Sequence, residues 1–269
     1  VGASKNTAKI IGDHTDKYVQ AYFQYDSKKS GGLTISHLRF GDHPIRSAYY
    51  VGDADCVVCG NPSYVDKYDM VGDVKPGGVF LLNCSWSEED LERRLPADMK
   101  RTLAQKGIHL YLCDAVTIAR EIGLKGRINT IIQSAYFKLA GILPAEEAIE
   151  YMKQGIVNDY AAKGQKIVDM NVAAVLAGQT AAREVAVPEH WAHLEEEPRA
   201  AVGLTGANAD QADYVQNILL PTNRMEGDSL PVSTFLPYAT GKVPSGTSAF
   251  EKRGIAVEIP VWHPENCIQ

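Results

Sequence analysis

The stretch Pro76-Gly-Gly-Val-Phe-Leu-Leu-Asn83 decides the fold, because a glycine turn leads there into an unbroken apolar run. A strand that is apolar at successive positions has both faces covered, as in a parallel sheet with helices on either side. Similar runs occupy residues 55–60 and 108–113, and helical periods separate the three runs. The sequence therefore predicts an α/β fold with a Rossmann-like, largely parallel sheet.

The hydrophobic periods on either side of these strands predict the remaining elements. Two further strands are expected over residues 18–25 and 33–40, and helices over residues 1–12, 64–74, 114–123, 127–143, 145–154, 156–162 and 166–182. Another helix opens at Ser87, where a capping hydroxyl precedes an acidic first turn. The helix at residues 1–12 opens with a glycine turn, which in α/β units follows the first strand. We therefore expect the first strand of the sheet to be missing from this chain.

The character of the chain changes along its length. Residues 1–186 form the first part. Predicted strands and helices alternate in it up to residue 143, and only helices are predicted from residue 144 onward. Between residues 187 and 252 prolines, glycines and an acidic segment interrupt the periods, which predicts a linker or a small irregular module. Residues 253–269 form a third part, the end of an extended irregular tail.

Composition argues against two classes of protein. The chain has 269 residues, 45% of them hydrophobic, which is enough for a substantial core. A net charge of -6 and a pI near 5.7 argue against a nucleic-acid surface. No apolar run approaches the roughly 18 residues that would suggest a membrane span. Five scattered cysteines are typical of reduced thiols, so we expect a cytoplasmic protein.

The cysteines do not form a predicted metal or redox motif. Cys56 and Cys59 have Cys-x-x-Cys spacing, but they lie in a predicted strand, where residues three apart face opposite sides. A redox or zinc motif needs both thiols to converge from a turn or a helix start. We therefore expect these two, like Cys84 and Cys113, to be core residues.

No catalytic residue is predicted either. The chain shows no nucleophile elbow, no complete P-loop and no paired carboxylates beyond ordinary helix faces. His190 and His193 are expected on the surface. His37 and Arg39 share one face of the strand at residues 33–40, where they could reach an anion, a neighbouring domain or only solvent.

A loop between the first two predicted strands has the composition of a phosphate site. Residues 27–32 read Ser-Lys-Lys-Ser-Gly-Gly. The glycines let the backbone approach an anion, the serines are neutral donors, and Lys28 and Lys29 supply positive charge. An ordinary solvated turn has the same residue types, so composition leaves both interpretations open.

The sequence around this loop, Tyr22-Phe-Gln-Tyr-Asp-Ser-Lys-Lys-Ser-Gly-Gly-Leu-Thr-Ile-Ser-His-Leu-Arg-Phe-Gly41, closely resembles the corresponding stretch of pyruvate:ferredoxin oxidoreductases, which are large single-chain members of the 2-oxoacid:ferredoxin oxidoreductase family. Three further segments match in the same order: Val1-Gly-Ala-Ser-Lys-Asn6, Lys75-Pro-Gly-Gly-Val-Phe-Leu-Leu-Asn-Cys-Ser85, and Phe250-Glu-Lys-Arg-Gly-Ile-Ala-Val257 running into Pro264-Glu-Asn-Cys-Ile-Gln269. The resemblance covers nearly the whole chain and implies that the chain is a piece of a longer parent.

The resemblance implies what that parent does. It would convert pyruvate and coenzyme A to acetyl-CoA and CO2 and pass electrons through 4Fe-4S clusters to ferredoxin or flavodoxin. Thiamine diphosphate, Mg2+ and the clusters would bind outside this chain, and the parent would be a cytoplasmic homodimer. Residues 1–186 resemble the family's γ-type domain, which packs over the active site and is implicated in holding coenzyme A. The piece alone is expected to be inactive.

The resemblance also implies site residues. The pyrophosphate and 3'-phosphate of coenzyme A suit a helix N-terminus and a lysine-rich loop. The expected contacts are Gly2, Ser4, Lys5 and Asn6 at the helix start and Ser27, Lys28, Lys29 and Ser30 in the loop. The family's glycine-rich turn before Val1 is absent, so affinity in the piece should be weak. Cys267 would be a 4Fe-4S ligand in the parent only, as the first cysteine of a ferredoxin domain that follows.

Two other functions stay open. In one, the chain is a purely structural module packed between domains, and the lysine loop faces a partner domain without a ligand. In the other, it is a nicotinamide-dependent Rossmann dehydrogenase. That function is disfavoured, because the sequence contains no Gly-x-Gly-x-x-Gly run.

Overall fold

The computed structural model describes residues 1–26, 32–195, 203–251 and 260–267. The chain divides into two compact units. The first unit contains residues 1–24 and 34–200, and the second contains residues 25–33 and 201–269. None of the described helices has the length and apolar character needed to cross a bilayer.

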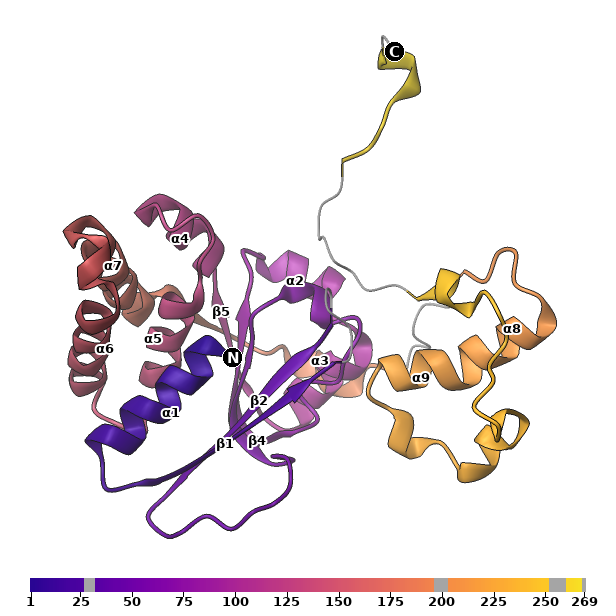
Figure 1. Cartoon of the computed structure of the whole chain (residues 1–269), viewed down its shortest axis with the longest axis horizontal. Coiled ribbons are helices and arrows are strands. Elements are labelled where there is room, and N and C mark those ends of the chain that lie inside the picture. Colours follow the sequence, from indigo (N-terminus) through magenta and orange to yellow (C-terminus); the bar gives the residue numbers. More distant parts are fainter. Residues whose placement is uncertain (27–31, 196–202, 252–259, 268–269) are drawn as a thin grey trace. The chain divides into compact units, whose positions relative to one another are not determined.

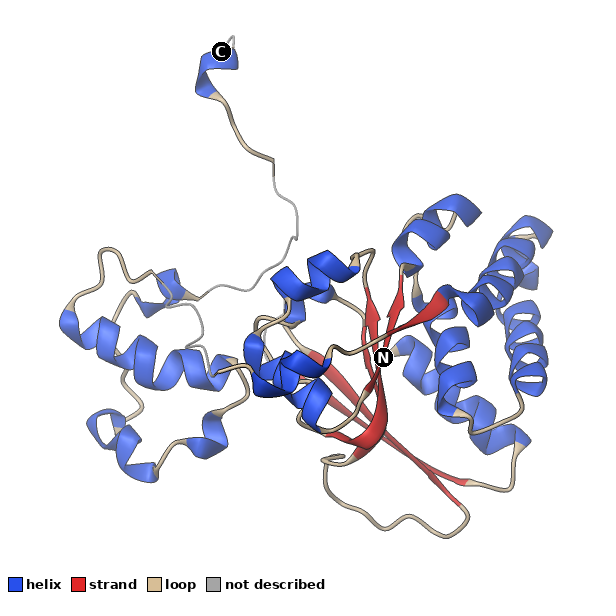
Figure 2. Ribbon diagram, turned by 180° about the vertical axis from the view of Figure 1, so that it is seen from behind, coloured by secondary structure: helices blue, strands red, loops and turns tan. Residues whose placement is uncertain are grey.

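A four-stranded sheet forms the centre of the first unit (Figure 2). Its strands are β3 (Ala54–Cys59), β4 (Val74–Asn83), β5 (His109–Cys113) and β6 (Ala182–Val185), in that order across the sheet. Strand β3 pairs with β4 and β4 with β5 in parallel, whereas β6 is antiparallel to β5. The largely parallel sheet expected from the apolar runs is confirmed.

Strand β4 separates two hydrophobic cores, because its successive side chains point to opposite faces. Phe80 and Leu82 belong to one core, with α2 (Glu88–Arg94) and α3 (Ala97–Gln105) above them. Leu81 belongs to the other, with α4 (Ala115–Ile122), α5 (Asn129–Ala140) and α7 (Gln165–Ala181). All three side chains are fully buried. Figure 1 shows these two groups of helices on opposite sides of the sheet.

Helix α1 (Gly2–His14) packs outside this second group of helices. Its Ile10 and Ile11 share a third core with Phe137 of α5 and with α6 (Ala145–Tyr160) and α7. Val19 and Phe40 join the same core from β1 (Tyr18–Tyr25) and β2 (Thr34–Gly41), which form a separate two-stranded sheet. The strands and the helix predicted at this end of the chain are confirmed.

The helix predicted over residues 64–74 is wrong. Only a 3-10 turn, Pro62–Tyr64, forms there, and Val74 already begins β4. The carboxylate of Asp69 accepts hydrogen bonds from the N–H groups of Val71 and Gly72, at 3.2 and 2.8 Å. Such local side-chain acceptors compete with helical hydrogen bonds and favour a turn.

Two other differences lie nearer the C-terminus of the first unit. The helices expected over residues 145–154 and 156–162 are one helix, α6, which continues through Gly155. Strand β6 was not predicted, although it pairs with most of β5. After β6, a 3-10 helix, Glu189–His193, packs on α3 and buries Trp191.

The second unit is mainly helical. Helix α8 (Ala209–Tyr214) continues through a π-helical turn, Val215–Leu219, into α9 (Leu220–Asn223). A capping box between Asn208 and Gln211 starts this helix. The 3-10 helices Gly227–Ser229, Val232–Tyr238, Thr247–Phe250 and Pro264–Asn266 follow.

Candidate functional site

The start of α1 offers backbone donors for an anion. Lys5 is the first residue whose N–H joins the helical ladder, at 2.9 Å from the carbonyl of Val1. The N–H groups of Gly2, Ala3 and Ser4 precede it, and the first turn of a helix leaves such groups without helical partners. Among the described residues no side chain caps this turn, and the turn itself contains no acidic residue. The helix dipole adds partial positive charge here.

Lys5 brings a full positive charge to the same place. Its side chain is exposed, and its Nζ lies 5.4 Å from the ring centroid of Phe23 on β1. This cation–π contact places the ammonium group beside a strand that ends two residues later, at Tyr25. The predicted phosphate loop begins just after that point in the sequence, at Ser27.

Asn6 points instead toward α5. Its Nδ2 donates to Oε1 of Gln133 at 3.3 Å, and Nε2 of Gln133 donates to Oγ1 of Thr7 at 3.1 Å. Gln133 and Thr7 are both buried. Asn6 therefore fixes α1 on α5 and positions the first turn, whereas Gly2 and Lys5 are exposed and Ser4 is half-buried.

The remaining residues predicted for the site are the four loop residues after β1 and Cys267. Ser27, Lys28, Lys29 and Ser30 lie outside the described residues. Cys267 is described and exposed, directly after the 3-10 helix Pro264–Asn266. Within the described ranges, no group of three or more His, Cys, Asp or Glu side chains is placed to hold a metal ion.

His37 and Arg39 hold a loop in place. The N–H of Val51 donates to Nδ1 of His37 at 3.2 Å, and Nε2 of His37 lies 3.5 Å from Oε1 of Gln24. Because Nδ1 accepts, the ring proton is on Nε2, and burial lowers the pKa of this imidazole. Arg39 donates to the carbonyl of Tyr50 at 2.8 Å. Both side chains are therefore occupied by contacts within the chain.

At the carboxyl edge of the sheet, where α/β folds usually bind ligands, Asn83 links the ends of two neighbouring segments. Its Nδ2 donates to the carbonyl of Gly60 after β3, and its Oδ1 accepts from the N–H of Ala115 at the start of α4, both at 3.0 Å. Asn83 was not among the predicted functional residues. In the sequence, Asn83 stands out only as the polar residue that ends the apolar run at residues 79–82.

The expectation of core cysteines is confirmed for Cys59, Cys84 and Cys113, which are buried. Burial raises the pKa of the Cys59 thiol to about 12 and that of Cys113 to about 11. Cys56 is half-buried, and burial raises its pKa to about 12 as well. These thiols stay protonated near neutral pH and are poor nucleophiles.

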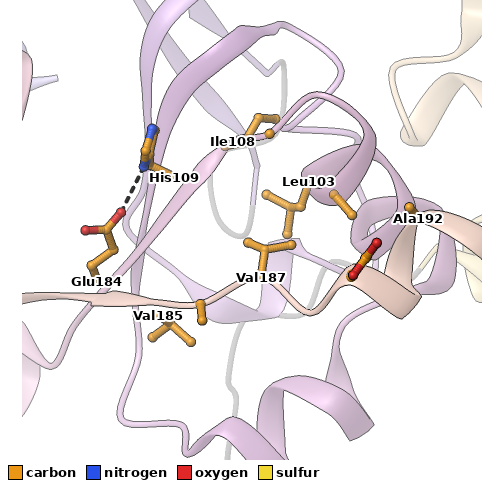
Figure 3. Close-up of a pocket in the computed structure, with 11 residues that line it drawn as sticks. Leu103, Ile108, His109, Glu184, Val185, Val187 and Ala192 are labelled. Atoms are coloured by element: carbon orange, nitrogen blue, oxygen red, sulfur yellow. Dashed lines mark hydrogen bonds and ion pairs between the residues drawn. The ribbon is translucent and has the colours of Figure 1, made fainter.

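A cavity of about 530 Å³ opens between α3, β6 and the segment after β6 (Figure 3). Leu103, Ile108 and Val187 line it, and His109 and Glu184 form a pair on its rim, with Nδ1 and Oε1 2.8 Å apart. Hydrogen bonds from His109 and Tyr111 hold the pKa of Glu184 below its ordinary value. Of the predicted site residues that the structure describes, none lines this cavity.

Comparison with known proteins gives a consistent result. Residues 1–181 match the family described as pyruvate ferredoxin/flavodoxin oxidoreductase, and residues 205–256 match a family described as a domain of unknown function. The chain is 55% identical over its whole length to pyruvate:ferredoxin oxidoreductase of Moorella thermoacetica, and 52% identical to pyruvate-flavodoxin oxidoreductase of Klebsiella pneumoniae. It spans 22% of the length of each.

A solved structure supports the fold. The pyruvate oxidoreductase subunit PORC of Thermotoga maritima superposes with a TM-score of 0.53 and 21% sequence identity. The match covers 69% of this chain and 90% of that subunit. At this identity the likeness establishes the α/β architecture alone.

Proposed function

Because the chain belongs to the pyruvate ferredoxin/flavodoxin oxidoreductase family, we propose that it is the coenzyme A-binding segment of a longer pyruvate:ferredoxin or pyruvate:flavodoxin oxidoreductase. The parent oxidises pyruvate in the presence of coenzyme A to acetyl-CoA and CO2. Two electrons leave through iron–sulfur clusters to ferredoxin or flavodoxin. The proposal assigns this chain the binding of coenzyme A and the packing of domains, and assigns the redox chemistry to the rest of the polypeptide.

The observation that carries the proposal is the first turn of α1. Three N–H groups precede the helical ladder there, no described side chain caps the turn, and Lys5 stands beside it with an exposed ammonium group. Coenzyme A presents a pyrophosphate and a 3'-phosphate, which are the anions that such a turn binds. Each charge-assisted hydrogen bond to a phosphate contributes about 1.5 to 3 kcal/mol before solvent screening.

Four loop residues complete the proposed set: Ser27, Lys28, Lys29 and Ser30. The support for them is their composition and the resemblance of this loop to the family's sequences. Lysine acts on phosphate as a mobile point charge, so Lys28 and Lys29 suit the doubly charged 3'-phosphate.

Thiamine diphosphate, Mg2+ and the 4Fe-4S clusters belong to other parts of the parent under this proposal. Cys267 could contribute one thiolate to a cluster, whereas a cluster needs four. Thiamine diphosphate would supply carbanion stabilisation during decarboxylation.

A purely structural module is the second candidate, and the contacts of Asn6 favour it. The hydrogen-bonded series from Asn6 through Gln133 to Thr7 ties the helix start to α5 without any ligand. A packing module would use the start of α1 in the same way. The two candidates predict different effects of substituting Lys5 and the loop lysines. Only the coenzyme A-binding segment predicts that such substitutions weaken the binding of coenzyme A.

The deciding experiment compares coenzyme A with dephospho-coenzyme A in the complete polypeptide. If the proposal holds, removing the 3'-phosphate weakens binding at least tenfold in isothermal titration calorimetry, and the Lys28→Ala/Lys29→Ala variant loses most of that discrimination. Equal affinity for the two compounds in both proteins would support the structural module.

A further inference from the structure

An uncharged stretch in the second unit has the composition of a buried interface. Between residues 230 and 250 the sequence contains a single charged residue, Lys242, although 22% of the whole chain is charged. Depletion of charge distinguishes the centre of a protein interface from ordinary surface. This stretch lies within residues 205–256, which match the domain of unknown function.

Four large apolar side chains of this stretch are exposed, and three of them lie on one 3-10 helix. Val232, Phe235 and Leu236, which we call the apolar ridge, lie on the 3-10 helix Val232–Tyr238 and are 86%, 40% and 70% exposed. Large apolar residues standing together in this way mark an interaction surface more often than single exposed ones do.

The apolar ridge is held rigidly. Pro231 and Pro237 bracket it, and proline fixes the backbone angle φ. Tyr238, at the end of the same 3-10 helix, packs edge-on against Tyr214 of α8, with ring centroids 5.2 Å apart. Little conformational entropy is therefore lost when a partner covers the ridge, which favours binding.

The module that carries the ridge has a small core of its own. Within residues 203–251 only Val215, Ile218 and Thr247 are buried. Units of this size bury a small fraction of their surface and are marginally stable unless something else supports them. Covering the ridge would supply the missing apolar burial.

We propose that the apolar ridge docks on an apolar, sparsely charged surface in the rest of the same long polypeptide. This inference rests on the proposed function, in which the chain is part of a longer polypeptide. The Moorella and Klebsiella relatives are about four to five times as long as this chain, so a covalently linked surface would be available at high effective concentration. A soluble protein that binds transiently is usually steered by charge, and the ridge carries none. The unassigned module is thus a docking element.

The test uses the complete polypeptide and this chain side by side. Hydroxyl-radical footprinting measures how readily Val232, Phe235 and Leu236 are oxidised. The proposal expects at least fivefold less oxidation in the complete polypeptide than in this chain. Equal oxidation in the two proteins would overturn it.

A pair of variants in the complete polypeptide tests the contact itself. Leu236→Glu places a charge in the ridge, and we expect oxidation of Val232 and Phe235 to rise to the level of the shorter chain. Gln216→Glu is the control. Gln216 is an exposed residue of the π-helical turn Val215–Leu219, outside the ridge, so this variant adds the same charge and should leave the oxidation of Val232 and Phe235 unchanged. Similar effects from both variants would contradict docking through the ridge.

Analytical ultracentrifugation of the shorter chain tests whether a second copy of the chain, and not the rest of the polypeptide, covers the ridge. We expect it to remain monomeric at the concentrations used for footprinting. A dimer that Leu236→Glu dissociates would assign the ridge to a second copy of the chain and overturn the proposal.

Discussion

The indole Nε1–H of Trp191 donates a hydrogen bond to Oε2 of Glu92 at 2.6 Å. The other carboxylate oxygen of Glu92 accepts from Nζ of Lys100 at 2.9 Å, and Lys100 also bonds the carbonyl of Glu92. Trp191 is buried and comes from the segment after β6, whereas Glu92 belongs to α2. The Glu92 carboxylate therefore links the segment after β6 to α2 and α3.

The first prediction concerns stability and pH. Hydrogen bonds from Lys100 and then from Trp191 lower the pKa of Glu92 from its ordinary value of 4.5. A carboxylate with a lowered folded-state pKa stabilises the protein above its unfolded pKa and ceases to do so as pH falls through the folded value. We expect Glu92→Gln to reduce the free energy of unfolding at pH 7, and the difference from wild type to shrink as the pH falls below 4.5 toward the lowered folded-state pKa of Glu92. Urea denaturation at several pH values measures this, and a difference that grows on acidification would contradict it.

The buried ring of Trp191 should contribute more to the free energy of unfolding than its hydrogen bond does. Trp191→Phe keeps most of the apolar volume and loses the N–H donor, so we expect a loss of about 1 kcal/mol. Trp191→Ala leaves a cavity in the core under α3 and should cost about 3 to 5 kcal/mol. Comparable losses in the two variants, measured by chemical denaturation, would show that the cavity contributes little.

The second prediction tests the start of α1. Lys5→Ala in the complete polypeptide should raise the KM for coenzyme A about three- to tenfold, because an exposed charge near phosphate is partly screened. Lys9→Ala is the matched control, since Lys9 is also an exposed lysine of α1 but lies one turn farther from its start. Equal effects of the two substitutions would remove Lys5 from the site.

The third prediction concerns the lysine loop. Lys28→Ala/Lys29→Ala should raise the KM for coenzyme A while pyruvate decarboxylation without coenzyme A continues at nearly the same rate. Two lost phosphate contacts correspond to at most about 3 to 6 kcal/mol, and screening reduces this. Steady-state assays with and without coenzyme A measure both quantities, and a parallel loss of both would indicate a structural role.

The fourth prediction compares two helical glycines. A Cβ atom at Gly178 of α7 would lie 2.5 Å from the carbonyl oxygen of Ile131 on α5, so Gly178→Ala should destabilise the protein by about 1 to 3 kcal/mol. Gly155 of α6 has no neighbour within 4 Å of a Cβ. Gly155→Ala should therefore stabilise the helix by about 0.5 to 1 kcal/mol. Thermal unfolding of both variants measures the sign, and a stabilising or neutral effect of Gly178→Ala would contradict the packing of α7 on α5.

The fifth prediction concerns the thiols. Cys267 is exposed, whereas burial raises the pKa of Cys56, Cys59, Cys84 and Cys113. With Ellman's reagent at pH 8 we expect one thiol per chain to react within seconds and the other four to react only on unfolding. Cys267→Ser should abolish the fast phase, and a second fast thiol in that variant would show that the sheet opens readily.

The sequence was sufficient for most of the sheet, because the strands before and after residues 79–83 are apolar at successive positions. Strand β6 could not be found in this way. Of its four residues only Val185 is buried, since the strand lies at the edge of the sheet, and the pairing with β5 is the contact that forms it. Edge strands are short and weakly patterned, so a single sequence seldom identifies them.

The candidate site was accessible to sequence reasoning only in part. The glycine, serine and lysine at the start of α1 were identifiable from composition and resemblance. The role of Asn6 was not, because its partner Gln133 lies on a helix far away in the sequence. Asn83 was missed for the same reason. Its role is to hydrogen-bond the carbonyl of Gly60 and the N–H of Ala115, which only the folded chain brings together.

The alternation along β4 also governs how substitutions combine. Phe80 and Leu82 belong to the core beneath α2 and α3, whereas Leu81 belongs to the core of α4, α5 and α7. Residues that share no partners usually have additive effects on stability. A loss on the side of Trp191 should therefore leave the packing of α5 against α1 unchanged. The start of α1, where we propose that an anion binds, can therefore accumulate sequence changes independently of the side of the sheet on which Trp191 packs.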